Sequence, residues 1–470
     1  MVCGTSSGAG KSLLTTALAR FYANQGLKVA PFKAQNMSNN ARVVEGGEMA
    51  SAQYLQALAA RCTPDVRMNP VLLKPESDTR SQVILLGRRD EALCAMEWRR
   101  RAQHLWPTVE TCLAELMAVH DLVIIEGAGS PAEINLQSTD IVNMRVAVAA
   151  DAATLLVCDV DRGGAFAHLY GTHQLLPPAQ RAMIRGFVLN KFRGDPQLLN
   201  PAPEMLRSLT GIPVLGVLPM WREHGLPEED GVFDSSTSGV GFSIAIVAYP
   251  RISNLDEFAP LRRLPAASVS WARRADTIAG ADLLILPGSK HVADDLDWLR
   301  RTGLDVAITQ HVRAGKPTLA ICGGLQMLGR ELLDPDAVEG AAQGLGILPI
   351  VTEFQRDKRY RRGSYAFGQL RGFWAPLKGL AFEGYEIRHG ATRTLEAEGR
   401  ALLLEPVLPD DCGWQQGQLL ALYTHGVFES GAVLRALFGA AVPTLEDTFD
   451  GLAAFVARHV SADILMDLLA

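Results

Sequence analysis

The feature that most constrains this chain is a glycine-rich segment near its start, Gly4–Ser12, which reads GTSSGAGKS. Small residues leave backbone N–H groups accessible to an anion, Lys11 can neutralise the outer phosphates of a nucleotide, and the Ser12 hydroxyl can bind Mg²⁺. Thr5 stands where a phosphate loop normally has glycine. The alternative is a strand-to-helix turn that binds nothing. We favour a nucleotide loop, because apolar residues recur at helical spacing over residues 14–21.

The stretch before this loop is short. Met1, Val2 and Cys3 alone precede it, whereas a strand of about five residues normally leads into such a loop. We therefore expect the first strand to be clipped, with residues upstream of Met1 missing from the chain.

Composition narrows the class of protein. The chain has 470 residues, enough for roughly two to four domains. Its net charge of −6 argues against a nucleic-acid partner. Seven scattered cysteines without a CxxC pair predict a reducing compartment and no zinc site. No apolar run is long enough to cross a bilayer and no signal peptide is recognisable, so we expect a cytoplasmic protein with no membrane partner.

Polar residues follow three apolar runs of the first half, at residues 122–125, 155–158 and 187–189. Continuous apolar runs are typical of strands buried on both faces of a parallel sheet. Glu126 ends the first run and is our candidate Mg²⁺-linked carboxylate. Asn190 ends the third and resembles the base-contacting Asn of P-loop proteins. The predicted ATP-binding residues are thus Thr5, Gly8, Gly10, Lys11, Ser12 and Asn190, with Ser12 and Glu126 at the metal.

A second catalytic signal lies in the other half, where the apolar run 318–321 leads into Cys322-Gly323-Gly324 and then a helical pattern. A cysteine at such an elbow is an exposed nucleophile, and a helix N-terminus lowers the pKa of such a thiol. His425 follows the run 419–422 and is the candidate base. Backbone N–H groups of Gly288 and Gly323 are candidate oxyanion donors.

The order of the elements predicts an α/β protein with two doubly wound, mostly parallel-sheet domains. We place the first domain at residues 1–222 and a linker rich in Gly, Glu, Asp and Ser at 223–241. The second domain would span 242–470 and carry the C-terminal helices on its outside. A basic run at 356–362 could steer an acidic substrate, but we favour a solvated loop.

Both halves resemble known families. The second is similar to class I glutamine amidotransferase domains, through its Cys-Gly-Gly elbow and the segment Tyr423-Thr424-His425-Gly426. The first resembles P-loop proteins of the dethiobiotin synthetase type, through the loop and Glu126-Gly127-Ala128-Gly129. Together they resemble the cobyric acid synthases of cobalamin biosynthesis over roughly residues 1–430. The stretches that carry this resemblance are 31–37 (PFKAQNM), 69–75 (NPVLLKP), 126–135 (EGAGSPAEIN) and 159–164 (DVDRGG).

This resemblance implies a P-loop NTPase-like domain, a flavodoxin-like glutaminase domain and a specific reaction. The b, d, e and g carboxylates of adenosylcobyrinic acid a,c-diamide would be amidated stepwise, each step using glutamine, ATP and Mg²⁺. Cys322 would release ammonia from glutamine, with His425 moving protons. ATP at the phosphate loop would convert a substrate carboxylate into an acyl phosphate, from which ammonia displaces phosphate. Oligomeric state and the order of amidation stay open.

Two positions depart from the family patterns. Many class I glutaminases carry an acid two residues after the histidine, where this chain has Val427. Glu429 is therefore a weak candidate third member beside Cys322 and His425. A Gly-Tyr-Glu-Ile-His stretch reads Gly-Tyr-Glu-Ile-Arg388-His389 here, and a shift of one residue would turn the histidine to the other face of a strand.

Two other functions were weighed. A cobyrinate a,c-diamide synthase-like amidase would run the same reaction on another acid, but the 69–75 stretch speaks against it. A nucleotide switch with a degenerate glutaminase used for docking is disfavoured by the intact Cys322 elbow and His425.

Overall fold

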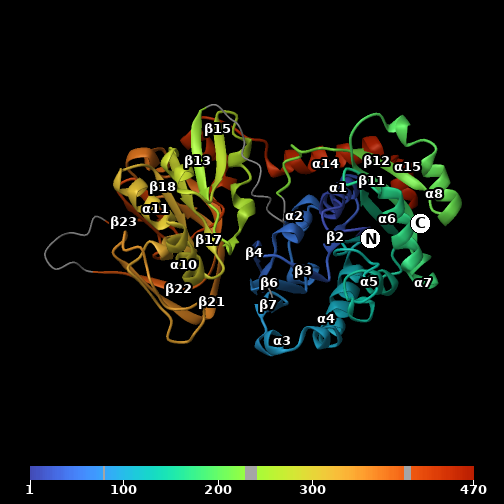
Figure 1. Cartoon of the computed structure of the whole chain (residues 1–470), viewed down its shortest axis with the longest axis horizontal. Coiled ribbons are helices and arrows are strands. Elements are labelled where there is room, and N and C mark those ends of the chain that lie inside the picture. Colours follow the sequence, from blue (N-terminus) through green and yellow to red (C-terminus); the bar gives the residue numbers. More distant parts are fainter. Residues whose placement is uncertain (78–79, 228–240, 396–403, 470) are drawn as a thin grey trace.

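Figure 1 shows the chain as two sheet-centred halves lying side by side. The structure is a computed structural model, and it describes residues 1–77, 80–227, 241–395 and 404–469. Residues 228–240 of the predicted linker lie outside the described residues. Within the described ranges, no helix is long and apolar enough to cross a membrane. The prediction of two α/β halves with mostly parallel sheets is confirmed.

The first half is built on parallel strands in the order β1-β10-β11-β12, with the parallel pair β2-β9 joined through a bridge between Val2 and Glu126. Strands β1, β2 and β10 are buried throughout, as expected for a sheet covered by helices, whereas β9, β11 and β12 are partly exposed. Their carboxyl ends share one edge. The strands are β1 (Val2–Gly4), β2 (Val29–Phe32), β9 (Leu122–Ile125), β10 (Thr154–Asp159), β11 (Ile184–Phe192) and β12 (Val214–Pro219).

Helices cover both faces of this sheet, and smaller strands project toward the second half (Figure 1). The helices are α1 (Lys11–Asn24), α2 (Ser51–Ala59), α3 (Glu91–Ala95), α4 (Trp98–Val119), α5 (Met144–Ala149), α6 (Ala165–Leu175), α7 (Pro178–Arg181) and α8 (Ala202–Thr210). The smaller strands are β3 (Gln35–Met37), β6 (Val71–Ser77), β7 (Arg80–Leu85) and β8 (Arg88–Arg89), with the hairpin β4 (Ala41–Val44) and β5 (Gly47–Ala50).

The second half has a seven-stranded sheet of order β15-β13-β16-β18-β25-β24-β23, parallel except for the pairings of β24 and β23. Its strands are β13 (Phe242–Val247), β15 (Ala267–Ala272), β16 (Leu283–Leu286), β18 (Thr318–Ile321), β23 (Glu405–Leu408), β24 (Gly413–Gln416) and β25 (Leu419–Leu422). Its helices are α9 (Ala275–Ala279), α10 (Val292–Thr302), α11 (Leu304–Arg313), α12 (Gly323–Met327) and α13 (Gly431–Phe438).

A side sheet of this half faces the first half. It consists of β19 (Glu331–Leu333), β20 (Ala342–Gln343), β21 (Ile350–Ala366) and β22 (Ala381–Thr394), and a further short pair is formed by β14 (Ile252–Ser253) and β17 (Gly288–Ser289). Tyr385 and Ile387 of β22 pack against Ala41 and Val43 of β4 in one buried cluster. The two halves therefore share an apolar contact.

The basic run 356–362 is part of strand β21, so the prediction of a loop is wrong, although most of its charged residues are exposed as predicted. Tyr360 of this run pairs with Ile387 across the hairpin formed with β22. Lys358 and Tyr360 reach the first half, where both hydrogen-bond to Glu48. The buried partner Glu48 explains why Lys358 is largely buried within an otherwise exposed run.

The C-terminal helices α14 (Leu445–His459) and α15 (Ala462–Asp467) pack on the first half, next to α1 (Figure 1). Phe449 and Leu452 share a buried cluster with Leu18. Arg20 of α1, whose side chain is fully buried, pairs with Glu446 at 2.5 Å. The sequence prediction had grouped these helices with the second half. An amphipathic pattern identifies a buried face but not the surface that it meets.

Candidate active sites

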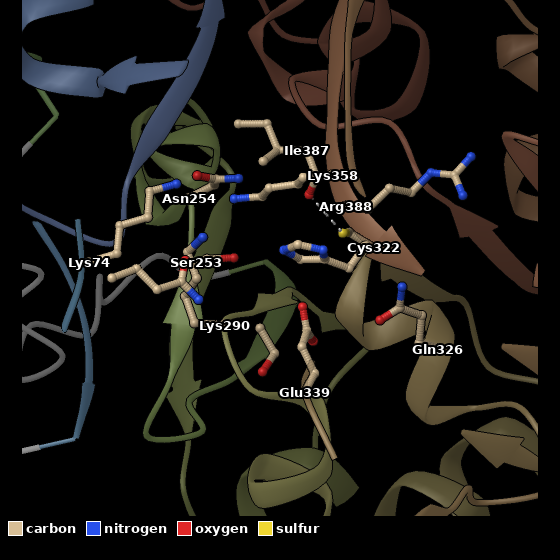
Figure 2. Close-up of a pocket in the computed structure, with 13 residues that line it drawn as sticks. Lys74, Ser253, Asn254, Lys290, Cys322, Gln326, Glu339, Lys358, Ile387 and Arg388 are labelled. Atoms are coloured by element: carbon tan, nitrogen blue, oxygen red, sulfur yellow. Dashed lines mark hydrogen bonds between the residues drawn. The ribbon is translucent and has the colours of Figure 1, made fainter. Parts of the chain in front are cut away.

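Cys322 lies at a tight elbow between β18 and α12, as its Cys-Gly-Gly sequence predicts. Its φ of 49° is unusual for a residue with a side chain and marks a strained turn. A Cβ atom at Gly324 would come within 2.2 Å of the Leu286 carbonyl oxygen, so only glycine fits there. The Cys322 Sγ lies 3.8 Å from the Ile387 carbonyl oxygen (Figure 2).

His425 lies beside Cys322, and Glu257 orients its ring. The His425 Nδ1 donates to Glu257 Oε1 at 2.8 Å, and the other Glu257 oxygen accepts from the Gly426 amide at 3.0 Å. Both side chains are almost fully buried. This arrangement leaves Nε2 as the nitrogen that can exchange a proton with substrate.

The charge of His425 follows from these neighbours. Burial alone would lower the pKa of His425, but the Glu257 carboxylate and the hydrogen bond with Cys322 raise the pKa to about 10. The ring is therefore protonated at neutral pH. A protonated imidazole next to a thiol can donate to a leaving amine.

The sequence candidate for a third member, Glu429, is wrong. Its carboxylate pairs with Arg42 of the first half at 2.5 Å and does not hold His425. The same buried guanidinium also binds Asp256, next to Glu257 in the chain. The signal that could have identified Glu257 is the polar stretch after strand β13, but its two acids look alike in the sequence.

Gly288 and Gly323 lie beside the catalytic pair. A Cβ atom at Gly288 would stand 3.0 Å from His425 Cε1, and one at Gly323 would stand 2.7 Å from the Ser289 nitrogen. Both glycines thus permit the close approach of β17, the elbow and the histidine. Their role as oxyanion donors stays a prediction.

Arg388 and His389 both line the cavity next to Cys322. The Arg388 guanidinium lies 3.8 Å from the centre of the Tyr423 ring and donates to Glu386 at 2.9 Å. His389 donates from Nδ1 to the Gln355 carbonyl oxygen. Burial, together with Lys358, lowers the pKa of His389 to about 4, so the ring is neutral.

The phosphate loop connects β1 to α1. Gly10 has a φ of 100°, and a Cβ atom there would stand 1.9 Å from Asn190 Nδ2. Asn190 donates to the Ala9 carbonyl oxygen at 2.8 Å, so it supports the loop directly. The Lys11 ammonium donates to the carbonyl oxygens of Ser6 and Gly129, at 3.0 and 3.1 Å. A contact between Asn190 and a base stays a prediction.

Glu126 lies next to Ser12, as predicted for a metal-linked pair. Its Oε1 accepts from the Ser12 hydroxyl and from Lys33 Nζ, both at 2.9 Å, and its Oε2 accepts from Gln56 at 2.5 Å. Burial acts to raise the pKa of Glu126, but Lys33 and the hydrogen bonds keep the pKa below its usual value. Sequence reasoning missed Lys33 and Gln56 as partners of this carboxylate.

The donor set at Glu126 fits Mg²⁺. No cluster of three His, Cys, Asp or Glu suited to a metal occurs among the described residues. However, Mg²⁺ that is bound with phosphates takes only one or two protein ligands. Ser12 and Glu126 supply two adjacent oxygen donors next to the phosphate loop, which is the chemistry that such an ion prefers.

Hydrogen bonds connect the segment after β3 to the thiol site. The Leu255 amide donates to Asn40 Oδ1 at 3.0 Å, and the Ala41 amide donates to Asn254 Oδ1 at 3.1 Å. The Asn254 Nδ2 lies 3.4 Å from both ring nitrogens of His425. The polar cluster at residues 35–40 therefore contacts the loop that carries Glu257.

Comparisons with known proteins find a match for each half of the chain. A family model described as a CobQ/CobB/MinD/ParA nucleotide binding domain matches residues 1–228. A second, described as a CobB/CobQ-like glutamine amidotransferase domain, matches residues 243–433.

Full-length relatives are similar over the whole chain. The cobyric acid synthase of Variovorax paradoxus (strain S110) is 59% identical, covering 100% of this chain and 99% of the relative. That of Methylibium petroleiphilum is 58% identical, covering 100% and 96%, and that of Polaromonas sp. (strain JS666) is 56% identical, covering 100% and 98%. With both domain models matched and similarity of this extent, the chain belongs to the cobyric acid synthase family.

Proposed function

We propose that this chain amidates the b, d, e and g carboxylates of adenosylcobyrinic acid a,c-diamide, giving adenosylcobyric acid. Glutamine supplies the nitrogen, and ATP with Mg²⁺ activates each carboxylate. Support comes from a Cys-His-Glu arrangement and a phosphate loop in one chain. It comes also from full-length similarity to proteins named cobyric acid synthase.

At the thiol site, the Cys322 thiolate attacks the side-chain amide carbon of glutamine. His425, held by Glu257, gives a proton to the departing nitrogen, so ammonia leaves and a thioester forms. Water then hydrolyses the thioester to glutamate and regenerates Cys322. Gly288 and Gly323 would stabilise the oxyanion of both tetrahedral intermediates.

At the phosphate loop, Lys11 and the backbone of Gly8 and Gly10 hold ATP, and Thr5 opens the loop. Ser12 and Glu126 would hold Mg²⁺, which offsets phosphate charge when bound. A substrate carboxylate oxygen attacks the γ-phosphorus and ADP leaves, giving an acyl phosphate. Ammonia attacks its carbonyl carbon, loses a proton and displaces phosphate, so an amide results. A carboxylate needs such activation because oxide is a poor leaving group.

In our proposal, the synthetase unit spans residues 1–222, the linker spans residues 223–241, and the glutaminase unit begins at residue 242. Helices α14 and α15 join the synthetase unit by their packing. All seven cysteines are unpaired, which supports a cytoplasmic location.

The single observation that carries this function is the hydrogen-bonded pair His425–Glu257 beside Cys322, in a chain that also has the loop. The test is mass spectrometry of adenosylcobyrinic acid a,c-diamide after incubation with the protein, ATP, Mg²⁺ and glutamine. We expect four successive mass changes, one per carboxylate. An unchanged corrinoid, with a protein that still hydrolyses glutamine, would contradict the proposed substrate.

A further inference from the structure

The cavity beside Cys322 carries positive charge from both halves of the chain. Lys290 and Lys358 of the second half line it, and so does Lys74 of β6 in the first half. In Figure 2, Lys74 and Lys290 lie across the cavity from Cys322 and Gln326. The cavity thus has a thiol at one side and ammonium groups at the other.

Glu48 of β5 is the carboxylate that holds two of these lysines. It forms buried ion pairs with Lys74 and with Lys358, the latter at 2.9 Å, and accepts from the Tyr360 hydroxyl at 3.3 Å. The charge of Lys290 is also attracted by Glu48, and by Glu339 in the same cavity. Two carboxyl groups, Glu48 and Glu339, therefore serve three clustered lysines.

The pKa values of the cluster reflect this excess of lysines over carboxyl groups. Burial, aided by Lys358, lowers the pKa of Lys290 to about 8, and burial raises the pKa of Glu339 in the same cavity to about 7. Buried ammonium groups without an equal number of anions are costly. An entering carboxylate would relieve that cost.

Glutamine has the matching shape. Its amide carbon must reach Cys322 Sγ, and its α-carbon lies three bonds further along the side chain. With the amide at Cys322, the α-carboxylate would point toward the lysines across the cavity, and Glu339 lines the same cavity. A carboxylate bound by two ammonium groups also fixes the amide at the thiol, which favours attack.

We propose that Lys290 and Lys358 bind the α-carboxylate of glutamine, and that Glu48 and Lys74 of the synthetase half position Lys358 for this contact. The inference rests on the proposed function, because it takes glutamine as the substrate of Cys322. Its consequence is that the glutamine pocket is shared by the two halves. Glu48 is a positioning residue, since it acts through Lys358.

The test compares glutamine with its α-amide, in which a neutral amide replaces the α-carboxylate. Wild-type protein should release ammonia from glutamine with a kcat/KM about ten- to a hundredfold higher than from the α-amide, as two charge-assisted contacts imply. Lys290→Met and Lys358→Met should each lower kcat/KM for glutamine by about tenfold and leave that for the α-amide within about threefold. Lys358→Arg should restore most of the preference.

Controls come from the same chain. Amidation driven by ammonium salt should be unchanged in every variant, which shows that the protein is folded. Arg356→Met removes an exposed cation from the same strand β21 and should keep the full preference for glutamine. Glu48→Gln should raise KM for glutamine more than it lowers kcat, with little effect on the α-amide.

Equal losses for glutamine and the α-amide in the lysine variants would overturn the carboxylate site, and so would a wild-type protein that does not distinguish the two. Both results leave glutamine hydrolysis intact and so differ from a failure of the proposed function. If wild-type protein releases no ammonia from glutamine, the proposed function and this site fall together.

Discussion

The two candidate sites differ in where their support comes from. The contacts that hold the phosphate loop and Glu126 come from the first half, through Asn190, Lys33 and Gln56. The thiol site, in contrast, is held partly by the other half, through Asn40 and Arg42. The chain can therefore transmit a change in the synthetase half to the glutaminase directly. None of the contacts named for the phosphate loop and Glu126 comes from the glutaminase half.

The largest expected effect concerns the phosphate-loop site, whose supporting contacts named above all come from the first half. Lys11→Ala should abolish amidation with glutamine and with ammonium salt, because the charge that faces the outer phosphates is lost. Glutamine hydrolysis at Cys322 should persist. Corrinoid mass spectra and ammonia release measure the two activities, and Lys28→Ala, at an exposed lysine beyond the far end of α1, is the control. Amidation that continues in Lys11→Ala would remove the loop from the mechanism.

The next largest effect concerns stability, and it shows which half of the chain the C-terminal helices α14 and α15 stabilise. Phe449→Ala should destabilise the first half by about 3–5 kcal/mol, because a fully buried ring is lost beside Leu18 and Leu452. Denaturant unfolding monitored together with ATP-dependent amidation measures it. Arg458→Ala on the exposed face of α14 should change little. A loss confined to glutaminase activity would place these helices with the second half after all.

Arg42→Met sharpens the contrast between the sites, because Arg42 joins the first half to Asp256 and Glu429. Removing a buried cation costs about 3–5 kcal/mol. The loop with Glu257 should shift, so glutamine hydrolysis falls about ten- to a hundredfold. Amidation from ammonium salt should keep its rate, and Arg42→Lys should lie between wild type and Arg42→Met. Equal losses with both nitrogen sources would mean a general loss of structure.

The smallest effect is a shift in pH dependence. The pKa of His425 is raised from its ordinary 6.5 to about 10, so the stabilisation from its charge is full below 6.5 and is lost as pH rises through about 10. Glu257→Gln removes the main cause of this rise. The alkaline limb of kcat/KM for glutamine hydrolysis should therefore move to lower pH. If the alkaline limb of the pH profile lies at the same pH in Glu257→Gln as in wild type, Glu257 does not set the charge of His425.

Local patterns in the sequence predicted the parts of the sites that depend on local geometry. Cys322 and its glycines mark a turn that only a few residue types can form, and the loop at Gly4–Ser12 does the same. Glu257 was missed because it lies 168 residues from His425, and no spacing rule joins them. The partner of Lys358 was missed because Glu48 lies in the other half.

The most direct test of the account separates the two nitrogen sources in Cys322→Ala. We predict that this variant loses amidation with glutamine completely and keeps the wild-type rate with ammonium salt, ATP and Mg²⁺. Cys62→Ala should keep both activities. Amidation from glutamine by Cys322→Ala, or loss of amidation from ammonium salt in a folded variant, would contradict the division of the reaction between two sites.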